Sequence, residues 1–450
     1  MENLKILIFG QSFNSNTGGG ITLSNLFCDW NKDDLAVLCT SHALGNISEG
    51  ICDNYYFIGS EENSWIFPFK YLQRSSPSGN LPFSQFTSSK TFLQKPGLRS
   101  QVVNRIFYPF LQWSGLVHVI SQIKLTSSLI NWVKNFNPNV IYIQVSTRES
   151  LKFGLLLSQR LKIPFVVHQM DDWMASIGYN GFMGNYWKKK IEGEFKNLVQ
   201  HADCCMSISD LMGKDYEQRF GKKFVTFHNP VDLDKWYPIR NENKNKSKTI
   251  SILYAGRTGF GIGSSLKSFA AAVELFNKKS EREVNFFIQT LEELSWVRSF
   301  KHTFYKELIP YDQLPHLFQN VDLLLLPCDF SGKAIRFLRL SMPTKAPEYM
   351  ISGTPILVLA PKETAIFQYS NDFGWAFTSE SDEVDHLVNV LEMILKNDVN
   401  QFNTTQRAMS LAKERHSGPV VRSKFLNEFL KIVDNKEPSY GIDIKSKSLI

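Results

Sequence analysis

The sequence predicts an α/β protein built from two doubly wound, Rossmann-like domains that face each other across a cleft. Short apolar runs alternate with stretches of helical period, and this pattern occurs once on each side of a polar stretch at 239–248. The apolar runs are continuous, which indicates parallel strands covered on both faces by helices. A chain of 450 residues also exceeds what one hydrophobic core comfortably organises, so two domains are expected.

The N-terminal half is expected to hold the first sheet. The longest uncharged run, 106–123, contains Pro109, Gln112 and His118, so we expect a helix buried in this domain, with a segment lying in a membrane interface as the alternative. Residues 71–101 are rich in Ser, Pro and Lys and predict a loop. The predicted strands are 5–10, 35–41, 139–146, 163–173, 202–209 and 223–232, and the predicted helices are 21–31 and 149–161.

The second half repeats the pattern after the stretch "IRNENKNKSK" at 239–248, whose polar composition predicts a linker. The division is therefore an N-terminal domain at 1–238, the linker, a C-terminal domain at 249–416, and a helix at 417–434 that packs back on the N-terminal domain. The predicted strands are 249–256, 283–290, 321–327, 355–360 and 374–379, and the predicted helices are 264–277, 312–319, 346–351, 382–396 and 419–433.

Composition restricts partners and compartment. The net charge of +7 favours anionic partners such as nucleotide phosphates or anionic lipid head groups, but it is too evenly spread to indicate nucleic acid. Six cysteines without C-x-x-C spacing argue against a zinc site or a disulfide framework. The N-terminus "MENLKILIFG" predicts a strand and not a signal peptide, so we expect a cytoplasmic protein.

Candidate ligand-binding residues follow the ends of strands, because ligands of open α/β sheets lie outside the carboxyl ends. Gly18, Gly19 and Gly20 follow the first strand and open the first helix, where a phosphate or a sugar could approach the backbone. A flexible loop is the alternative. The run is not G-x-G-x-x-G, so the dinucleotide fingerprint is absent.

The motif "HQMDDW" supplies the predicted catalytic residues His168, Asp171 and Asp172 at another strand end. An acidic pair can orient sugar hydroxyls, bind a divalent metal or cap the next helix, and capping is the commonest fate of such an Asp. For His168, a hydrogen-bonded structural role remains open beside a catalytic one.

Two motifs of the second half predict a diphosphate site. "YAGRTGFGIG" places Arg257 at a strand end, with Gly259 and Gly261 after it, and a guanidinium beside an approachable backbone suits a diphosphate. "PTKAPEYMISG" places Lys345 at the start of a short helix and Glu348 inside it. A surface arginine and a solvated helix carboxylate are the alternatives.

Taken together, "HNPVD" (228–232), "YAGR" (254–257), "VDLLLLP" (321–327) and "SMPTKAPEYMISGTPILV" (341–358) resemble the large retaining, nucleotide-sugar-dependent family of GT-B fold glycosyltransferases, which is family four-like. The similarity is strongest from 200 to 380 and is closest to bacterial enzymes of surface-polysaccharide assembly. It implies that Glu348 holds the nucleotide ribose and Arg257 the donor diphosphate. Lys345 could supply the charge of a phosphate-binding lysine that relatives carry soon after that arginine. Leu340 stands where the family usually has a second glutamate, so the sugar contact must come from elsewhere, such as the backbone of 341–344 or Asp329.

The resemblance implies a hexosyltransferase-like enzyme that moves a sugar, with retention, from a nucleotide-sugar to a polysaccharide or lipid-linked oligosaccharide acceptor. We expect no metal and no other cofactor, because Arg257, the 258–263 loop and Lys345 could stabilise the leaving diphosphate. We also expect no nucleic-acid partner, and peripheral contact with an anionic membrane through the aromatic segments 65–70 and 106–120, at the inner face of the plasma membrane. An NAD-dependent oxidoreductase and a non-catalytic nucleotide-sugar-binding relative are the alternatives.

Overall fold

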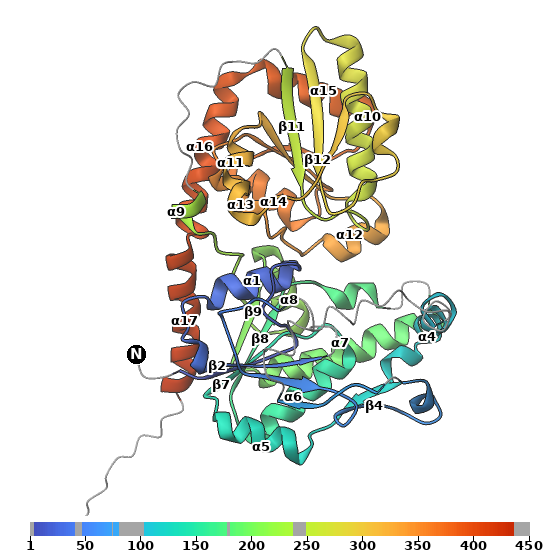
Figure 1. The fold of residues 1–450 in the computed structure, drawn as a ribbon, viewed down its shortest axis with the longest axis vertical. Coiled ribbons are helices and arrows are strands. Elements are labelled where there is room, and N and C mark those ends of the chain that lie inside the picture. The colour runs from blue at the N-terminus through green and yellow to red at the C-terminus, as the bar shows by residue number, and fades with distance from the viewer. Residues whose placement is uncertain are drawn as a thin grey trace, which may run out of the picture.

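The fold consists of two parallel-sheet bodies stacked along the long axis of the molecule (Figure 1). The computed structural model describes residues 4–40, 47–73, 75–80, 103–177, 181–236 and 249–435. The predicted linker at 239–248 and most of the predicted loop at 71–101 lie outside these ranges. The predicted fold class, two doubly wound Rossmann-like bodies, is confirmed.

The N-terminal sheet is parallel except for its last strand, which pairs antiparallel with its neighbour. Its central strands are buried on both faces, as continuous apolar runs require. In spatial order the strands are β10 (Val225–Thr226), β9 (Cys204–Ser207), β8 (Phe165–Gln169), β7 (Val140–Ile143), β1 (Ile6–Phe9), β2 (Leu35–Thr40), β3 (Tyr55–Ile58) and β5 (Gly79–Asn80). The reversal of strand order on either side of β1 places the carboxyl ends of β1 and β7 at the topological switch point, where such sheets bind ligands.

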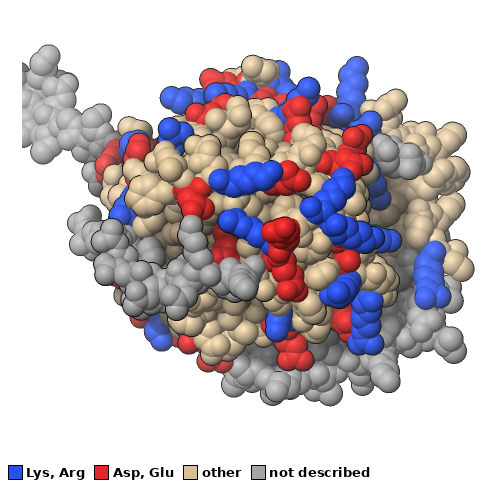
Figure 2. Space-filling view, turned by 90° about the horizontal axis from the view of Figure 1, so that it is seen from above, with Lys and Arg blue, Asp and Glu red and all other residues tan. Residues whose placement is uncertain are grey.

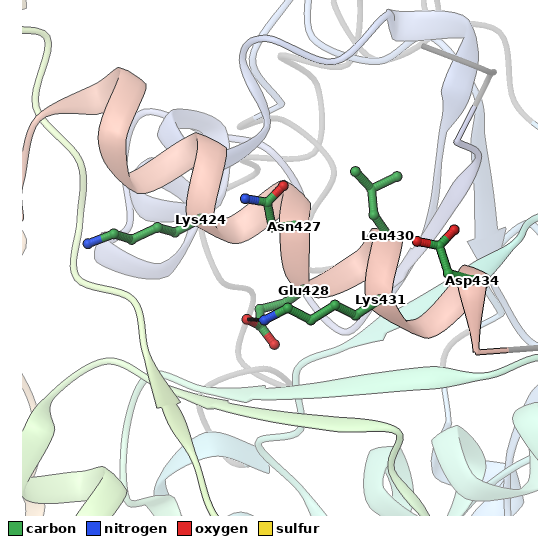
Figure 3. Close-up of a pocket in the computed structure, with 6 residues that line it drawn as sticks. All are labelled: Lys424, Asn427, Glu428, Leu430, Lys431 and Asp434. Atoms are coloured by element: carbon green, nitrogen blue, oxygen red, sulfur yellow. Dashed lines mark hydrogen bonds and ion pairs between the residues drawn. The ribbon is translucent and has the colours of Figure 1, made fainter.

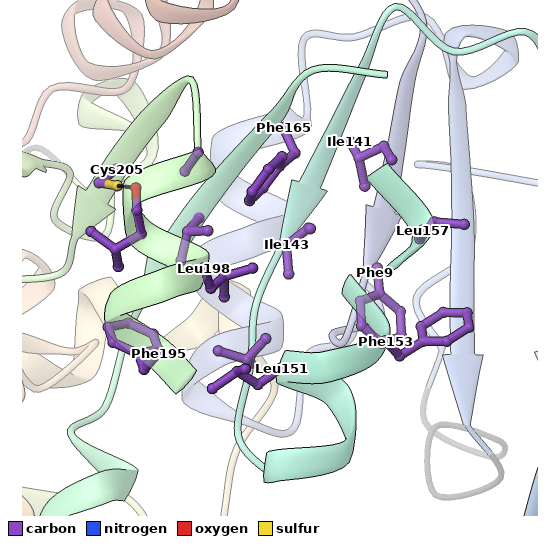
Figure 4. Close-up of a cluster of buried hydrophobic side chains, with 14 of the residues drawn as sticks. Phe9, Ile141, Ile143, Leu151, Phe153, Leu157, Phe165, Phe195, Leu198 and Cys205 are labelled. Atoms are coloured by element: carbon purple, nitrogen blue, oxygen red, sulfur yellow. Dashed lines mark hydrogen bonds between the residues drawn. The ribbon is translucent and has the colours of Figure 1, made fainter. Parts of the chain in front are cut away.

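One face of this sheet carries the larger core of the domain. Phe9, Ile141 and Ile143 project from the strands toward Leu151 and Phe195 of the covering helices (Figure 4). Phe9 and Phe153 pack with ring centroids 5.1 Å apart. The helices that contribute to this core are α5 (Ser127–Phe136), α6 (Arg148–Leu161), α7 (Gly184–His201) and α8 (Asp210–Phe220).

The opposite face is covered by two helices from the two ends of the chain, α1 (Gly18–Phe27) and α17 (Gly418–Asp434). Phe425 and Phe429 of α17 are fully buried against Phe27 and Tyr142. Phe27 and Phe425 meet edge to face at 5.1 Å. The last helix therefore completes the core of the first domain, although the whole C-terminal domain separates the two in sequence.

The C-terminal sheet is fully parallel. Its order is β13 (Thr303–Lys306), β12 (Glu283–Gln289), β11 (Thr249–Ala255), β14 (Leu323–Pro327), β15 (Ile356–Leu359) and β16 (Phe377–Ser379). One face is covered by α10 (Gly263–Lys279) and α15 (Val384–Lys396). The other face packs against α11 (Leu314–Gln319), α13 (Ala346–Ile351), α14 (Ala365–Phe373) and α16 (Asp398–Arg415).

The chain crosses between the domains twice, and the described parts of the two crossing segments lie side by side. Val231, just before α9 (Leu233–Trp236), forms an isolated parallel bridge with Ser417, just before α17. The Val231 N–H donates to the carbonyl of His416 at 2.8 Å, and the Gly418 N–H donates to the carbonyl of Val231 at 2.9 Å. The two crossing segments are therefore held side by side by backbone hydrogen bonds.

The prediction of a buried helix at 106–123 is wrong. The run contains the helix α4 (Tyr108–Ser114) and the strand β6 (Ser121–Ile123), which pairs with β4 (Asn63–Trp65). Within α4 only Leu111 is buried, whereas Phe110 and Trp113 are half exposed. The left-handed Gly115 ends α4, so one apolar run is divided into short elements at the edge of the domain. Among the described residues, no helix has the length and apolarity needed to cross a membrane.

Candidate functional site

The two domains meet at the segment 339–345, called here the bridging segment, which links α12 (Gly332–Leu338) to α13. In Figure 1, α12 and α13 lie at the end of the C-terminal domain that faces α1 and α8. Four hydrogen bonds connect this segment to the N-terminal domain. The segment donates two of them, from Arg339 to Asp215 (2.6 Å) and from Ser341 to Asp171 (2.8 Å). It accepts the other two, at the Leu340 carbonyl from Ser209 (2.6 Å) and at the Thr344 carbonyl from Asn229 (2.9 Å).

Three of these four partners follow strand ends, and the fourth, Asp215, lies within α8. Asp171 follows β8, Ser209 follows β9 and caps α8, and Asn229 follows β10. On the other side, Lys345 lies at the carboxyl end of β11, since its ammonium donates to the Ala255 carbonyl. The bridging segment therefore joins the carboxyl ends of both sheets, where ligands of such sheets bind.

Gly18 faces this segment, whereas Gly19 and Gly20 face residues of their own domain. A β-carbon on Gly18 would lie 2.8 Å from the Thr344 hydroxyl oxygen, and one on Gly20 would clash with the Asn14 side chain at 2.1 Å. Thr17 caps the helix by accepting a hydrogen bond from the Gly20 N–H at 3.1 Å. In this structure the group close to Gly18 is Thr344 of the other domain, and the approach of a phosphate or a sugar stays a prediction.

Arg257, Lys345 and Glu348 form a charged cluster beside the end of β11. Arg257 is exposed, and it lies near enough to help lower the pKa of Lys345. The Lys345 ammonium lies 4.3 Å above the centre of the Tyr254 ring. Gly256 has φ +152°, and a β-carbon there would lie 1.8 Å from the Lys345 nitrogen, so only glycine leaves room for this lysine.

Burial shifts the pKa values of both ionisable groups of α13 and its first turn. The pKa of Lys345 falls from 10.5 to about 7 because burial disfavours the ammonium, although Glu348 opposes the shift. The pKa of Glu348 rises from 4.5 to about 7 because burial disfavours the charged carboxylate. Glu348 is 6% exposed and accepts a hydrogen bond from the Tyr311 hydroxyl at 2.7 Å. Perturbed groups of this kind gather at functional sites more often than elsewhere.

The two predicted glycines of the loop after Arg257, Gly259 and Gly261, differ in how much space surrounds them. Gly259 has φ +109°, and open space surrounds the place of a β-carbon, so its backbone is accessible. Gly261 has φ +85°, and its β-carbon position lies 3.0 Å from Leu338. Asp329 accepts a hydrogen bond from the Ser265 N–H at 2.9 Å, so it caps the start of α10.

The predicted catalytic residues do not form one constellation. His168 is fully buried within the sheet, its Nδ1 lies 2.7 Å from the Tyr142 hydroxyl, and burial lowers its pKa to about 3. Asp172 is 2% exposed and bonded to Tyr216 (2.9 Å) and Arg219 (3.2 Å). Substrate cannot reach either group in this conformation, which favours structural roles. Asp171 alone is exposed, and it contacts the bridging segment.

Leu340 lies where the resembling family has a glutamate, and its side chain is fully buried in the core of the N-terminal domain. It therefore anchors the bridging segment and contacts no sugar. Sequence reasoning missed Tyr311, Tyr254 and the docking residue Ser209, because tyrosines and serines at these spacings carry no distinctive pattern. Tyr254, within "YAGR", and Asn229, within "HNPVD", did lie in motifs that had been singled out, but neither was assigned a role.

The described ranges contain no metal-binding cluster, and a surface depression on α17 is lined by none of the charged cluster. No group of three or more His, Cys, Asp or Glu side chains there is placed to hold a metal ion. The open depression lies along α17 (Figure 3). Its lining residues are Lys424, Asn427, Glu428, Leu430, Lys431 and Asp434, all from α17 itself.

Comparison with known proteins identifies the fold. No family model and no curated protein sequence matches the chain. HepE from Anabaena in complex with UDP superimposes with a TM-score of 0.57 at 12% identity, covering 95% of this chain and all of that one. Sucrose-phosphate synthase from Thermosynechococcus elongatus superimposes with a TM-score of 0.61 at 10% identity, and the match covers 96% of this chain and 99% of that one. A putative UDP-N-acetylglucosamine 2-epimerase from Listeria monocytogenes superimposes with a TM-score of 0.51 at 12% identity, and the match covers 96% of this chain and 98% of that one.

Proposed function

We propose that this protein, which has the GT-B fold, is a glycosyltransferase that uses a nucleotide-sugar donor. The observation that carries the proposal is the cluster of Arg257, Lys345 and buried Glu348 at the carboxyl end of β11. A guanidinium and an ammonium suit a diphosphate, and a buried carboxylate suits a pair of ribose hydroxyls. The UDP complex of the structurally similar HepE supports a nucleotide ligand for this fold.

The proposed mechanism depends on positive charge at the leaving group. As the bond from the sugar to the diphosphate breaks, Arg257 and a protonated Lys345 would stabilise the growing negative charge. The backbone around Gly259, which is open, would add N–H donors. These groups would make a metal ion or other cofactor unnecessary, and we propose transfer with retention because the motifs resemble a retaining family.

The acceptor is proposed to bind on the N-terminal side. Asp171 and the glycines of α1 lie across the bridging segment from the donor cluster, which is where a second substrate would meet the sugar. We propose a polysaccharide or lipid-linked oligosaccharide acceptor at the cytoplasmic face of the plasma membrane. The Leu340 side chain is buried, so recognition of the donor sugar falls to the backbone of 341–344.

The donor site is tested by calorimetry with UDP-glucose at pH 8 on Glu348→Ala and Arg257→Ala. Each variant should weaken binding by at least about tenfold, because each loses a charge-assisted contact. Glu363→Ala and Arg160→Ala, at exposed positions outside the cluster, are matched controls that should bind like wild type. Unchanged binding in both cluster variants would refute the site.

Other functions remain distinguishable by experiment. An NAD-dependent oxidoreductase would place a pyrophosphate at Gly18 to Gly20, where Thr344 and Asn14 lie in this structure, and it predicts a thermal shift with NAD. A non-catalytic binder would bind UDP-, GDP- or dTDP-sugars without slowly hydrolysing any of them. An epimerase would release a changed sugar without an acceptor. A glycosyltransferase should instead hydrolyse its donor slowly and give no NAD shift.

A further inference from the structure

We propose that one edge of the N-terminal domain is a docking surface for an anionic lipid membrane. This surface, called here the aromatic edge, combines residues from three separate segments. The first segment is 66–72, the second is 106–113 and the third is 182–186. Phe67, Tyr71 and Phe182 are 73%, 71% and 78% exposed, which is unusual for large apolar side chains of a soluble surface. The exposed members are Ile66, Phe67, Tyr71, Leu72, Ile106, Tyr108, Phe110, Trp113, Phe182, Met183 and Tyr186.

Ring contacts show that the three segments form a continuous surface. Phe69 and Phe107 pack at 5.9 Å, which joins the first segment to the second. Trp113 and Phe182 pack at 5.9 Å, and the Phe182 N–H donates to the Trp113 carbonyl at 2.7 Å, which joins the second to the third. The third segment was not predicted from the sequence, because its aromatic residues stand more than sixty positions beyond α4.

Positive side chains are exposed on the described part of the same segments, Lys70 beside Tyr71 and Arg105 beside Ile106. No Asp or Glu occurs between Glu62 and Glu149, whereas nine Lys and Arg do. Four of these nine lie outside the described residues. Without this stretch of sequence the chain has 41 Lys and Arg against 43 Asp and Glu, so the positive excess is less evenly spread along the sequence than expected. Lys188, Lys189 and Lys190 of α7 are also exposed, beside Tyr186. By contrast, both signs alternate over the end of the molecule seen in Figure 2.

This combination fits an anionic bilayer. Aromatic rings favour the head-group level, Leu72 and Ile106 favour the acyl boundary, and lysines are attracted by anionic lipid. A nucleic acid would accept the rings and the positive charge, but it would gain little from exposed aliphatic side chains. We therefore assign the membrane as the partner.

The location also indicates how an acceptor would arrive, and this step rests on the proposed function. Asp171, which bonds to Ser341 of the bridging segment, and Phe182 of the aromatic edge belong to the same connection between β8 and α7. A molecule anchored in the bilayer beside Phe182 would therefore be presented toward the donor cluster. The inference selects the lipid-linked acceptor over a free polysaccharide.

The test is flotation of the full chain with neutral phosphatidylcholine vesicles and with vesicles containing 30% phosphatidylglycerol. Wild type should float with the anionic vesicles at low salt and much less at 0.5 M salt. Trp113→Ser/Phe182→Ser and Lys188→Ala/Lys189→Ala should each weaken partitioning by roughly tenfold. Matched controls on the C-terminal domain are Leu291→Ser/Phe402→Ser and Lys278→Ala/Lys362→Ala, at exposed positions.

Several outcomes would overturn the proposal. They are no flotation of wild type, equal losses in the edge and control variants, or binding of a single-stranded oligonucleotide that exceeds vesicle binding and falls in the same edge variants. Donor binding measured by calorimetry separates this proposal from the previous one. The edge variants should bind UDP-glucose like wild type, and Glu348→Ala should float like wild type. Thermal melting of each variant would identify any loss of folding.

Discussion

Glu348 retains its proton to a higher pH than an ordinary carboxylate because α13 buries it beneath Tyr311. Its pKa in the folded chain is about 7, against 4.5 for the free group. Between these values the folded state still binds a proton that the unfolded chain has released. The free energy of unfolding contributed by this group therefore falls as the pH rises from 4.5 to about 7.

Glu348→Gln removes this titration and should change the pH profile of stability. The melting temperature of the variant, taken relative to wild type, should rise by about a few degrees between pH 5 and pH 7.5 and then level off. Calorimetric melting at four pH values measures it. Glu363→Gln, at an exposed position, should show a constant difference. A constant difference for Glu348→Gln as well would contradict the raised pKa.

The positions of individual charged residues could be predicted from the sequence, but the side chains that contact them could not. Arg257, Lys345 and Glu348 come together because strand ends meet, which strand and helix patterns already imply. Tyr311 could not be assigned to Glu348, because that contact depends on how the loop before α11 folds over α13. His168 and Asp172 looked like site residues because they follow a strand, yet both are buried within the domain.

The bridging segment acts as one element because an apolar anchor and several polar contacts hold it against the N-terminal domain. Leu340 is fully buried there, and Met342 packs against the cores of both domains. If a donor binds at Lys345 and Glu348 as proposed, an element held in this way would couple that binding to the relative position of the domains. Release of these contacts would let the domains separate as rigid bodies.

Leu340→Glu introduces the family's usual residue into this apolar site and should loosen the docking of the domains. A buried carboxylate without a partner costs several kcal/mol, so the segment would leave its site before accepting the charge. Small-angle scattering should show a larger radius of gyration than for wild type. Leu340→Met, which conserves volume, should leave the radius unchanged. An unchanged radius in Leu340→Glu would show that Leu340 does not hold the domains together.

Most strands that are buried on both faces were predicted, whereas strands at sheet edges were predicted poorly. The buried strand β3 is an exception, because it was not predicted. The strands β1, β7, β11 and β14 are continuous apolar runs, which only a covered parallel sheet explains. The edge strand β13 was missed because it is partly exposed and has mixed side chains. The run at 106–123 was misread because an exposed apolar surface has the same composition as a buried helix.

Across the whole molecule, the N-terminal domain depends on residues at the other end of the chain. Phe425→Ala should lower the free energy of unfolding of that domain by about 3–5 kcal/mol, because a buried phenylalanine is lost. Hydrogen exchange should show faster opening of β1 and β7 than of β11 and β14. Leu430→Ala, at a 37% exposed position of the same helix, should have little effect. Equal protection of both sheets in Phe425→Ala would contradict the dependence.

The position of α17 has a consequence during synthesis of the chain. Domains generally fold as they emerge from the ribosome, N-terminal first. Here the face of the first sheet that carries Tyr142 stays partly uncovered until residues 418–434 have been made, after the entire C-terminal domain. The nascent first domain therefore exposes Phe27 and Tyr142 throughout that interval, and exposed apolar surface of this kind favours aggregation.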